Sequence, residues 1–214
     1  MAGPYMPAMV YSTLDDLLTR ASTRLDPVDG ATRLPEGGDL DFLTAEQIAA
    51  IRPAAVLVGL IPRVGGATAL LTQRPDTMEK HPGQVAFPGG KVDPEDANEV
   101  DAALREAEEE VGVDPATVNL VARGAPYLTG TGFRIVPVVG VLPADFEARP
   151  CETEVAHVFE TPLDFLFDPA NHDRQSGTWR GQERHYYQMP HGGFRIWGVT
   201  AGIIRALYLE LYGG

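Results

Sequence analysis

Cysteine is nearly absent, because Cys151 is the only one among 214 residues. A single thiol excludes an internal disulfide and any zinc cluster built on several cysteines. Long apolar segments are missing too, since no run approaches the roughly 20 residues that a transmembrane helix needs. The first residues, MAGPYMPAMVYSTLDDL, lack a basic stretch followed by an apolar one, so no signal peptide is expected. These features predict a cytoplasmic protein with no membrane partner.

Positive charge is also scarce. The chain has 17 Lys and Arg residues against 30 Asp and Glu, which gives a formal net charge of -13. A general nucleic-acid-binding protein needs a basic surface to displace counterions, so nucleic acid is not an expected partner. An acidic protein can still bind an anionic small molecule where metal ions or local Arg and Lys residues invert the field.

Helical and extended patterns are interleaved, which predicts an α/β (α+β) fold with a mixed sheet. Residues 1–52 are interpreted as an N-terminal helical extension packed on a main domain of residues 53–214. Helices are expected at residues 12–25, 45–51, about 98–111 and 200–212. Strands are expected at residues 54–61, 67–74, 84–87, 117–124 and 132–142, within 154–167 ahead of a short helix, and as a hairpin at 185–190 and 193–198.

Four glutamates crowd five positions of one expected helix, at residues 106 and 108–110, after the turn Pro88-Gly89-Gly90. At 100° per residue, Glu106, Glu109 and Glu110 share a face that is separate from the apolar one. Three neighbouring carboxylates repel one another unless a hard divalent cation such as Mg²⁺ or Mn²⁺ lies among them. A solvated acidic surface is the alternative on the helix alone. The preceding glycines favour the metal site, because their backbone can approach a cation or a phosphate closely.

The segment from Gly90 to Val113 resembles the Nudix box, whose pattern ends in R-E-U-x-E-E-x-G-U. Residues 105–113, REAEEEVGV, match that ending at every fixed position. Arg105 follows Gly90 by fifteen residues, whereas fourteen is usual, and Asp96 lies near the position of the usual glutamate. This offset is typical of one branch of the family.

That branch is the coenzyme A pyrophosphatase type, whose upstream signature is L-L-T-x-R-[SA]-x3-R-x3-G-x3-F-P-G-G. The chain has LLTQR at 70–74, Gly83 and FPGG at 87–90 at the same spacing. Pro75 and Glu79 depart from the pattern, and Glu79 replaces an arginine that could recognise a phosphate. Residues 129–140, 152–163 and 194–207 also resemble this branch, so the likeness covers roughly residues 50–212.

The resemblance implies an α/β/α sandwich that hydrolyses a nucleoside diphosphate linked to another moiety. It implies that Glu106, Glu109, Glu110 and the Gly90 carbonyl hold Mg²⁺ or Mn²⁺, with Arg105 orienting the carboxylates. For coenzyme A, the products would be 3′,5′-ADP and 4′-phosphopantetheine. Glu154 is the candidate general base, followed by Glu152. The candidates for contact with the phosphates are Arg74, Lys80, His81 and Gly89.

Several alternatives remain open from the sequence. The substrate could instead be ADP-ribose, a dinucleotide or a nucleoside triphosphate, and a non-catalytic nucleotide-binding regulator is a further reading. Phe133 and the pair Tyr186-Tyr187 could contact an adenine or belong to the core. The protein is expected to be a monomer or a homodimer.

Overall fold

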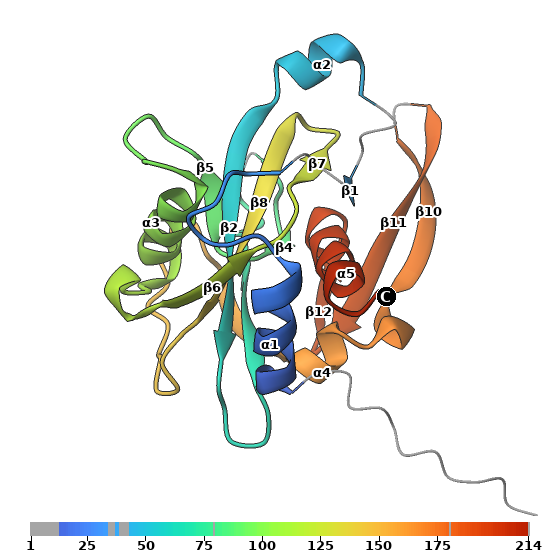
Figure 1. The fold of residues 1–214 in the computed structure, drawn as a ribbon. Coiled ribbons are helices and arrows are strands. Elements are labelled where there is room, and N and C mark those ends of the chain that lie inside the picture. Colours follow the sequence, from blue (N-terminus) through green and yellow to red (C-terminus); the bar gives the residue numbers. More distant parts are fainter. Residues whose placement is uncertain (1–12, 34–36, 39–42, 79, 180, 214) are drawn as a thin grey trace, which may run out of the picture.

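The computed structural model describes residues 13–33, 37–38, 43–78, 80–179 and 181–213 (Figure 1). Its helices are α1 (Leu14–Arg24), α2 (Ala45–Ala49), α3 (Glu99–Val111), α4 (Leu163–Leu166) and α5 (Val199–Tyr212), with short 3-10 turns at Pro115–Thr117 and Pro169–Asn171. Its strands are β1 (Gly37–Gly38), β2 (Arg52–Ile61), β3 (Thr68–Gln73), β4 (Val85–Ala86), β5 (Gly89–Lys91), β6 (Asn119–Arg123), β7 (Tyr127–Thr129), β8 (Phe133–Val141), β9 (His157–Pro162), β10 (Asp173–Trp179), β11 (Gln182–His191) and β12 (Phe194–Trp197).

The central sheet is mixed, as predicted. Its long middle pair, β2 and β8, is parallel and runs in register from Arg52↔Phe133 to Leu60↔Val141. On its other edge β2 pairs antiparallel with β3 and β5, and β3 continues to β4 and β9. Strands β10, β11 and β12 form a separate antiparallel sheet.

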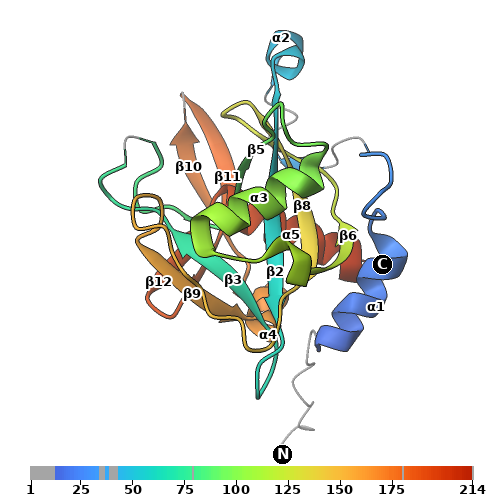
Figure 2. The ribbon, with the colours of Figure 1, turned by 90° about the vertical axis from the view of Figure 1, so that its left-hand side faces the viewer.

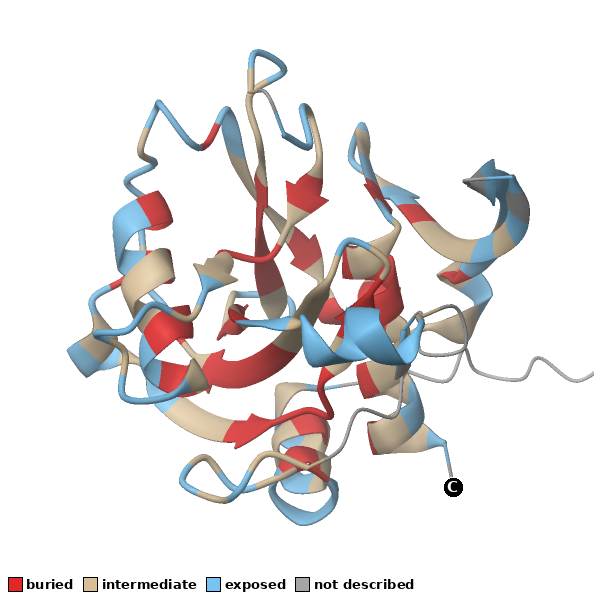
Figure 3. Cartoon of the chain, turned by 90° about the horizontal axis from the view of Figure 1, so that it is seen from above, coloured by how far each residue is buried: buried red, intermediate tan, exposed pale blue. Residues whose placement is uncertain are grey.

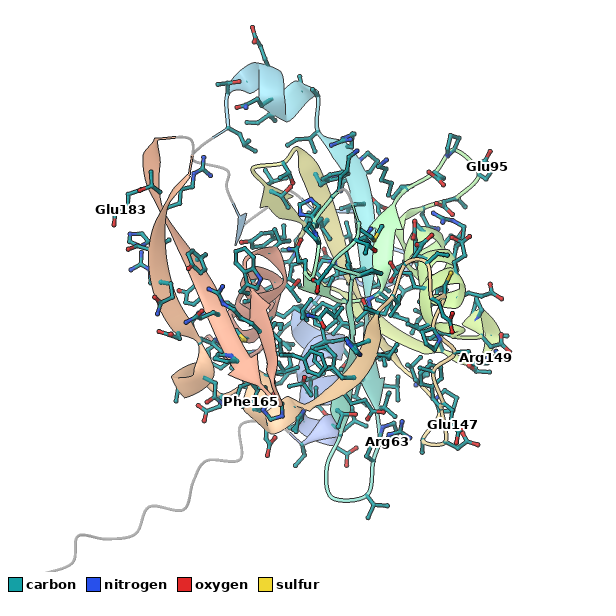
Figure 4. The ribbon with its side chains drawn as sticks, turned by 180° about the vertical axis from the view of Figure 1, so that it is seen from behind. Arg63, Glu95, Glu147, Arg149, Phe165 and Glu183 are labelled. Carbon is teal, nitrogen blue, oxygen red and sulfur yellow. The ribbon has the colours of Figure 1, made fainter. Side chains whose placement is uncertain are left out.

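Helices cover both faces of the central sheet, which confirms the expected α/β/α arrangement. Helix α3 packs on one face against β2, β5 and β8, while α1 and α5 lie on the other (Figures 1 and 2). Buried residues run through the middle of the molecule between these layers (Figure 3). The α3 side carries Glu95 and Arg149, and the opposite side carries Glu183 on β11 (Figure 4).

Local signals explain where α3 begins and ends. The Asn98 side chain caps the helix by accepting hydrogen bonds from the backbone N–H groups of Val100 and Asp101. Gly112 ends it in the left-handed region at φ 72°, where glycine costs least. Val100, Ala103, Ala107 and Val111 are buried, as the apolar stripe predicts. Leu104, on the same predicted stripe, is only half-buried.

The N-terminal segment packs on the core, although its boundary at residue 52 stays a prediction. Thr13 caps α1, and Leu17 and Ala21 are buried together with residues of α5. Arg20 donates a hydrogen bond from Nη1 to the carbonyl of Leu211 at 3.3 Å. Thr44 forms a capping box at the start of α2, at the position expected for its cap.

The sequence prediction of a turn at residues 88–90 is wrong in one respect. Gly89 and Gly90 begin the strand β5, which pairs with Val56 and Ala55 of β2. A side chain on Gly89 would overlap the β2 backbone at Ala55, so only glycine allows this close pairing. Strands β1, β7 and β10 were not predicted either, because their residues lack a clear alternation. Within the described residues, no helix has the length and apolar character needed to cross a membrane.

Candidate active site

Glu110 is a buried carboxylate at the C-terminal end of α3. Its residue is only 5% exposed, and the backbone N–H of Gly89 donates a hydrogen bond to Oε2 at 3.3 Å. Burial, assisted by the nearby negative charge of Glu106, raises the pKa of Glu110 to about 8. The Gly89 hydrogen bond and the positive charge of Arg74 oppose this rise. The predicted substrate contact Gly89 therefore directs its N–H at a carboxylate in this structure.

Glu106 lies one turn earlier and faces the same glycine pair. Burial raises the pKa of Glu106, Arg105 opposes the change, and the charges of Glu109 and Glu154 add to it. A Cβ atom at Gly90 would overlap the Glu106 carboxylate. The Glu106 side chain therefore packs directly on the backbone of Gly90. The two predicted metal ligands Gly90 and Glu106 are in contact.

Arg105 binds several of the carboxylate side chains from the outer side of the site. Its guanidinium donates two hydrogen bonds of 2.9 Å to the Asp96 carboxylate and one of 3.1 Å to the Lys91 carbonyl. Its Nη1 also reaches Glu106 at 3.2 Å and Glu109 at 3.3 Å. The hydrogen bonds from Arg105 lower the pKa of Asp96. A fork of this kind fixes the orientation of the guanidinium, so Arg105 is a positioning residue.

The three glutamates differ in their environments. The Glu109 side chain is 59% exposed and is held by Arg105, whereas Glu110 is turned into the interior. Glu108 is exposed, as expected. Across the part of the chain that the structure describes, no three acidic, histidine or cysteine side chains converge as a preassembled metal site.

Glu154 reaches this site from a loop far along the chain. The backbone N–H of Cys151 donates to the Glu110 carbonyl at 2.9 Å, and that of Ala156 donates to Gln73 at 2.8 Å. These bonds fasten the loop to α3 and β3. The negative charge of Glu154 contributes to the raised pKa values of both Glu106 and Glu110. The candidate general base Glu154 is therefore close to Glu106 and Glu110.

The candidate phosphate contacts separate into two groups. Arg74 directly follows β3, its charge acts on Glu110, and its buried Nε has no hydrogen-bond acceptor within the described structure. Lys80 is exposed, and His81 lines a cavity described below. His81 has a φ of 55°, an uncommon conformation for a residue with a side chain. Glu79 lies outside the described residues.

The chemistry of this group suits a hard divalent cation. Glu106, Glu109, Glu110 and the Gly90 carbonyl offer oxygen only, which is the donor type that Mg²⁺ and Mn²⁺ prefer. The sequence places Asp96 near the position of the usual Nudix-box glutamate. It does not show that Asp96 pairs with Arg105, because that contact depends on how the loop folds.

Comparison with known proteins assigns the fold and the family. The NUDIX domain family model matches residues 51–180. The chain is 43% identical over 160 residues to "Uncharacterized Nudix hydrolase NudL" of Enterobacter sp. strain 638, covering 75% of this chain and 83% of that protein. It is 38% identical over 199 residues to NudL of Citrobacter koseri, covering 93% and 95%.

A solved structure of a NUDIX hydrolase from Alicyclobacillus acidocaldarius shares the fold. It aligns with a TM-score of 0.51 at 19% identity over 76% of this chain and 94% of that one. The family model covers more than half of the chain, and the two relatives are matched over most of their length. The chain therefore belongs to the Nudix hydrolase family.

Proposed function

We propose that this Nudix hydrolase cleaves the diphosphate of coenzyme A or its derivatives to 3′,5′-ADP and 4′-phosphopantetheine. The observation that carries the proposal is a hydrogen bond between two sequence signatures. Gly89 belongs to the coenzyme A-type signature at residues 70–90, and its backbone N–H donates to Glu110 of the Nudix box at 3.3 Å. The charge of Arg74, from the same signature, lowers the pKa of Glu110. The segment that resembles the coenzyme A-type branch is therefore adjacent to the glutamates of the Nudix box.

Glu106, Glu109, Glu110 and the carbonyl of Gly90 would hold Mg²⁺ or Mn²⁺, which when bound neutralises the diphosphate and lowers the pKa of water. Arg105 orients Glu106 and Glu109 through the contacts of 3.2 and 3.3 Å. Arg74 offers a buried N–H without an acceptor in the described structure, which suits a phosphate oxygen.

The reaction needs one proton acceptor and no covalent intermediate. The oxygen of a water molecule forms the new bond to phosphorus, and the bond from phosphorus to the bridging oxygen breaks. Glu154 takes the proton of the attacking water as general base. Its position beside Glu106 and Glu110 supports this role, because the charge of Glu154 is felt by both carboxylates.

Hydrolysis with a panel of substrates tests the proposal. The purified protein is incubated with coenzyme A, ADP-ribose and NADH in the presence of Mg²⁺ or Mn²⁺, and products are separated by chromatography. We expect 3′,5′-ADP from coenzyme A and no product in EDTA. Turnover of ADP-ribose or NADH without turnover of coenzyme A would contradict coenzyme A as the substrate and leave diphosphate hydrolysis supported. Pro75 and Glu79 would then be the first residues to test as the cause.

A further inference from the structure

Three of the four candidate phosphate contacts lie on one loop, residues 74–84, which joins β3 to β4. Two hydrogen bonds close this loop at its base. The backbone N–H of Arg74 donates to the Gln84 carbonyl at 3.0 Å. The Gln73 side chain donates to the Gly83 carbonyl at 3.1 Å. The position of the loop therefore depends on the position of β4, the strand at its far end.

Strand β4 is only two residues long and is the last strand along the path of the central sheet. It pairs with β3, with Val85 opposite Gln73 and Ala86 opposite Thr72. A further hydrogen bond comes from α5, which lies next to β4 (Figure 1). The hydroxyl of Thr200, in the first turn of α5, donates to the Val85 carbonyl at 2.8 Å. One side-chain hydroxyl thus joins α5 to the strand that closes the loop.

Both partners of this hydrogen bond are buried. Thr200 is 4% exposed and Val85 is 1% exposed, so water cannot take the place of the hydroxyl. A buried carbonyl that loses its donor carries an uncompensated cost of desolvation. Without the Thr200 hydroxyl, β4 should therefore move or open, and the loop that is joined to it should move as well.

The glycines of the carboxylate site are anchored to a different strand. Gly89 and Gly90 pair with β2, and the backbone N–H of Leu57 donates to the Pro88 carbonyl at 2.8 Å. Helix α3, which bears the glutamates, also packs on β2 and β5. A disturbance of β4 should therefore change the loop while the carboxylate site keeps its position.

The loop also forms part of the wall of a large cavity. The volume of this cavity is about 1030 Å³. Its wall includes His81 and Gln84 of the loop, and Gly198 and Val199 directly before Thr200. This volume is at the upper end of the range for small-molecule sites. The loop and the start of α5 therefore adjoin a space of substrate size, and the shape of that space depends on how the two are joined.

We propose that Thr200 is a positioning residue for substrate binding. Its hydroxyl holds β4, and β4 holds the loop that presents Arg74 and His81 to the phosphates of the substrate. The effect is on substrate affinity and not on the chemical step, because the carboxylate site is anchored to β2. This inference rests on the proposed function, since it takes residues 74–84 as the loop that binds the diphosphate.

Three variants separate the hydroxyl from the rest of the side chain. Thr200→Val keeps nearly the same shape without the donor, whereas Thr200→Ser keeps the donor and loses one methyl group. Thr161→Val is the matched control, because Thr161 is 0% exposed and its hydroxyl has no hydrogen-bond partner within the described residues.

Two measurements are made on each protein. Steady-state kinetics give kcat and KM for coenzyme A with Mg²⁺. Amide hydrogen exchange, followed by mass spectrometry, compares residues 72–86 with residues 88–91. Thermal unfolding checks that each protein is folded.

We expect Thr200→Val to raise KM by about five- to twentyfold and to change kcat less than about threefold. Residues 72–86 should exchange faster in this variant, while residues 88–91 exchange as in the unmodified protein. Thr200→Ser and Thr161→Val should stay within about twofold of the unmodified protein in both constants.

An unchanged KM in Thr200→Val, or an equal rise of KM in Thr200→Ser, would overturn the inference and leave the proposed function standing. A fall in kcat larger than the rise in KM would overturn it as well. If coenzyme A is not hydrolysed, the proposed function fails and the exchange data decide the inference. Faster exchange confined to residues 72–86 in Thr200→Val then supports the positioning role, and exchange equal to that of the unmodified protein overturns it.

Discussion

Gly90 and Glu106 meet at a point that cannot accommodate one additional methyl group. The glycine belongs to a short strand whose partner is β2, so its backbone cannot withdraw without breaking that pairing. Glu106 is fixed from the other side by Arg105. The position of this carboxylate therefore depends on the absence of a side chain at residue 90. A side chain added there should reduce activity more than it reduces stability.

The change Gly90→Ala tests this dependence. The new Cβ would overlap the Glu106 carboxylate and displace it, so we expect kcat/KM to fall by roughly 10- to 100-fold. The melting temperature should change little by comparison. Gly59→Ala is the control, because its Cβ would meet the side chains of Leu142 at 3.2 Å and Leu57 at 3.8 Å and no carboxylate among its nearest neighbours. An equal loss of kcat/KM in both variants would contradict the prediction.

Two neighbouring glutamates allow the general base to be identified. Glu154→Gln should lower kcat by about 100- to 10,000-fold, because the amide cannot accept the proton. Glu152→Gln, an exposed position two residues earlier, should leave kcat within about threefold. Steady-state kinetics with coenzyme A give both values. A large loss in Glu152→Gln with normal turnover in Glu154→Gln would transfer the role to Glu152.

At the scale of elements, the edge of the central sheet is fastened by an ion pair between β9 and the loop that follows β2. Arg63 donates to Glu160 at 2.5 and 3.0 Å, and it also donates to the carbonyls of Ala144 and Phe146 at 2.6 and 2.9 Å. One guanidinium thus joins β9, the β2–β3 loop and the segment after β8. The hydrogen bond from Arg63 lowers the pKa of Glu160.

The pH dependence of stability should report this pair. A carboxyl group whose pKa is lower in the folded state stabilises the protein above its unfolded pKa, and this stabilisation is lost as pH falls through the folded pKa. Glu160→Gln should therefore reduce the free energy of unfolding by about 1 kcal/mol at pH 7, since the pair is partly exposed. The difference from the unmodified protein should shrink below about pH 4.5. Chemical denaturation at pH 7 and pH 3.5 measures it, and a difference that does not depend on pH would contradict the assignment.

At the scale of the whole molecule, α1 and α5 share the core on one face of the central sheet. Leu17 is 1% exposed and belongs to the same buried cluster as Leu207 and Leu211 of α5. The sequence predicts an N-terminal extension, residues 1–52, packed on the main domain, and in the structure α1 belongs to the same layer as α5.

The change Leu17→Ala tests whether this layer is one cooperative unit. Removing the buried side chain should lower the free energy of unfolding by about 2–4 kcal/mol while the protein still unfolds in one transition. Ser22→Ala, at an exposed position of the same helix, should have little effect. Two separate transitions in Leu17→Ala, with the second unchanged, would show that the N-terminal segment is independent of the main domain.

Local patterns of the sequence determined where α3 forms. The spacing of apolar residues over one helix, the cap at Asn98 and the stop at Gly112 all act within a few residues, so periodicity is enough to predict them. The same is true of the Nudix pattern at residues 105–113. The tertiary structure decided which glutamates are buried, because Glu110 and Glu109 are adjacent on the helix but only Glu110 faces β5. It also brought residue 154 to residue 110 and Thr200 to the carbonyl of Val85. Such contacts join distant segments, and their formation depends on how whole layers pack, which no short pattern contains.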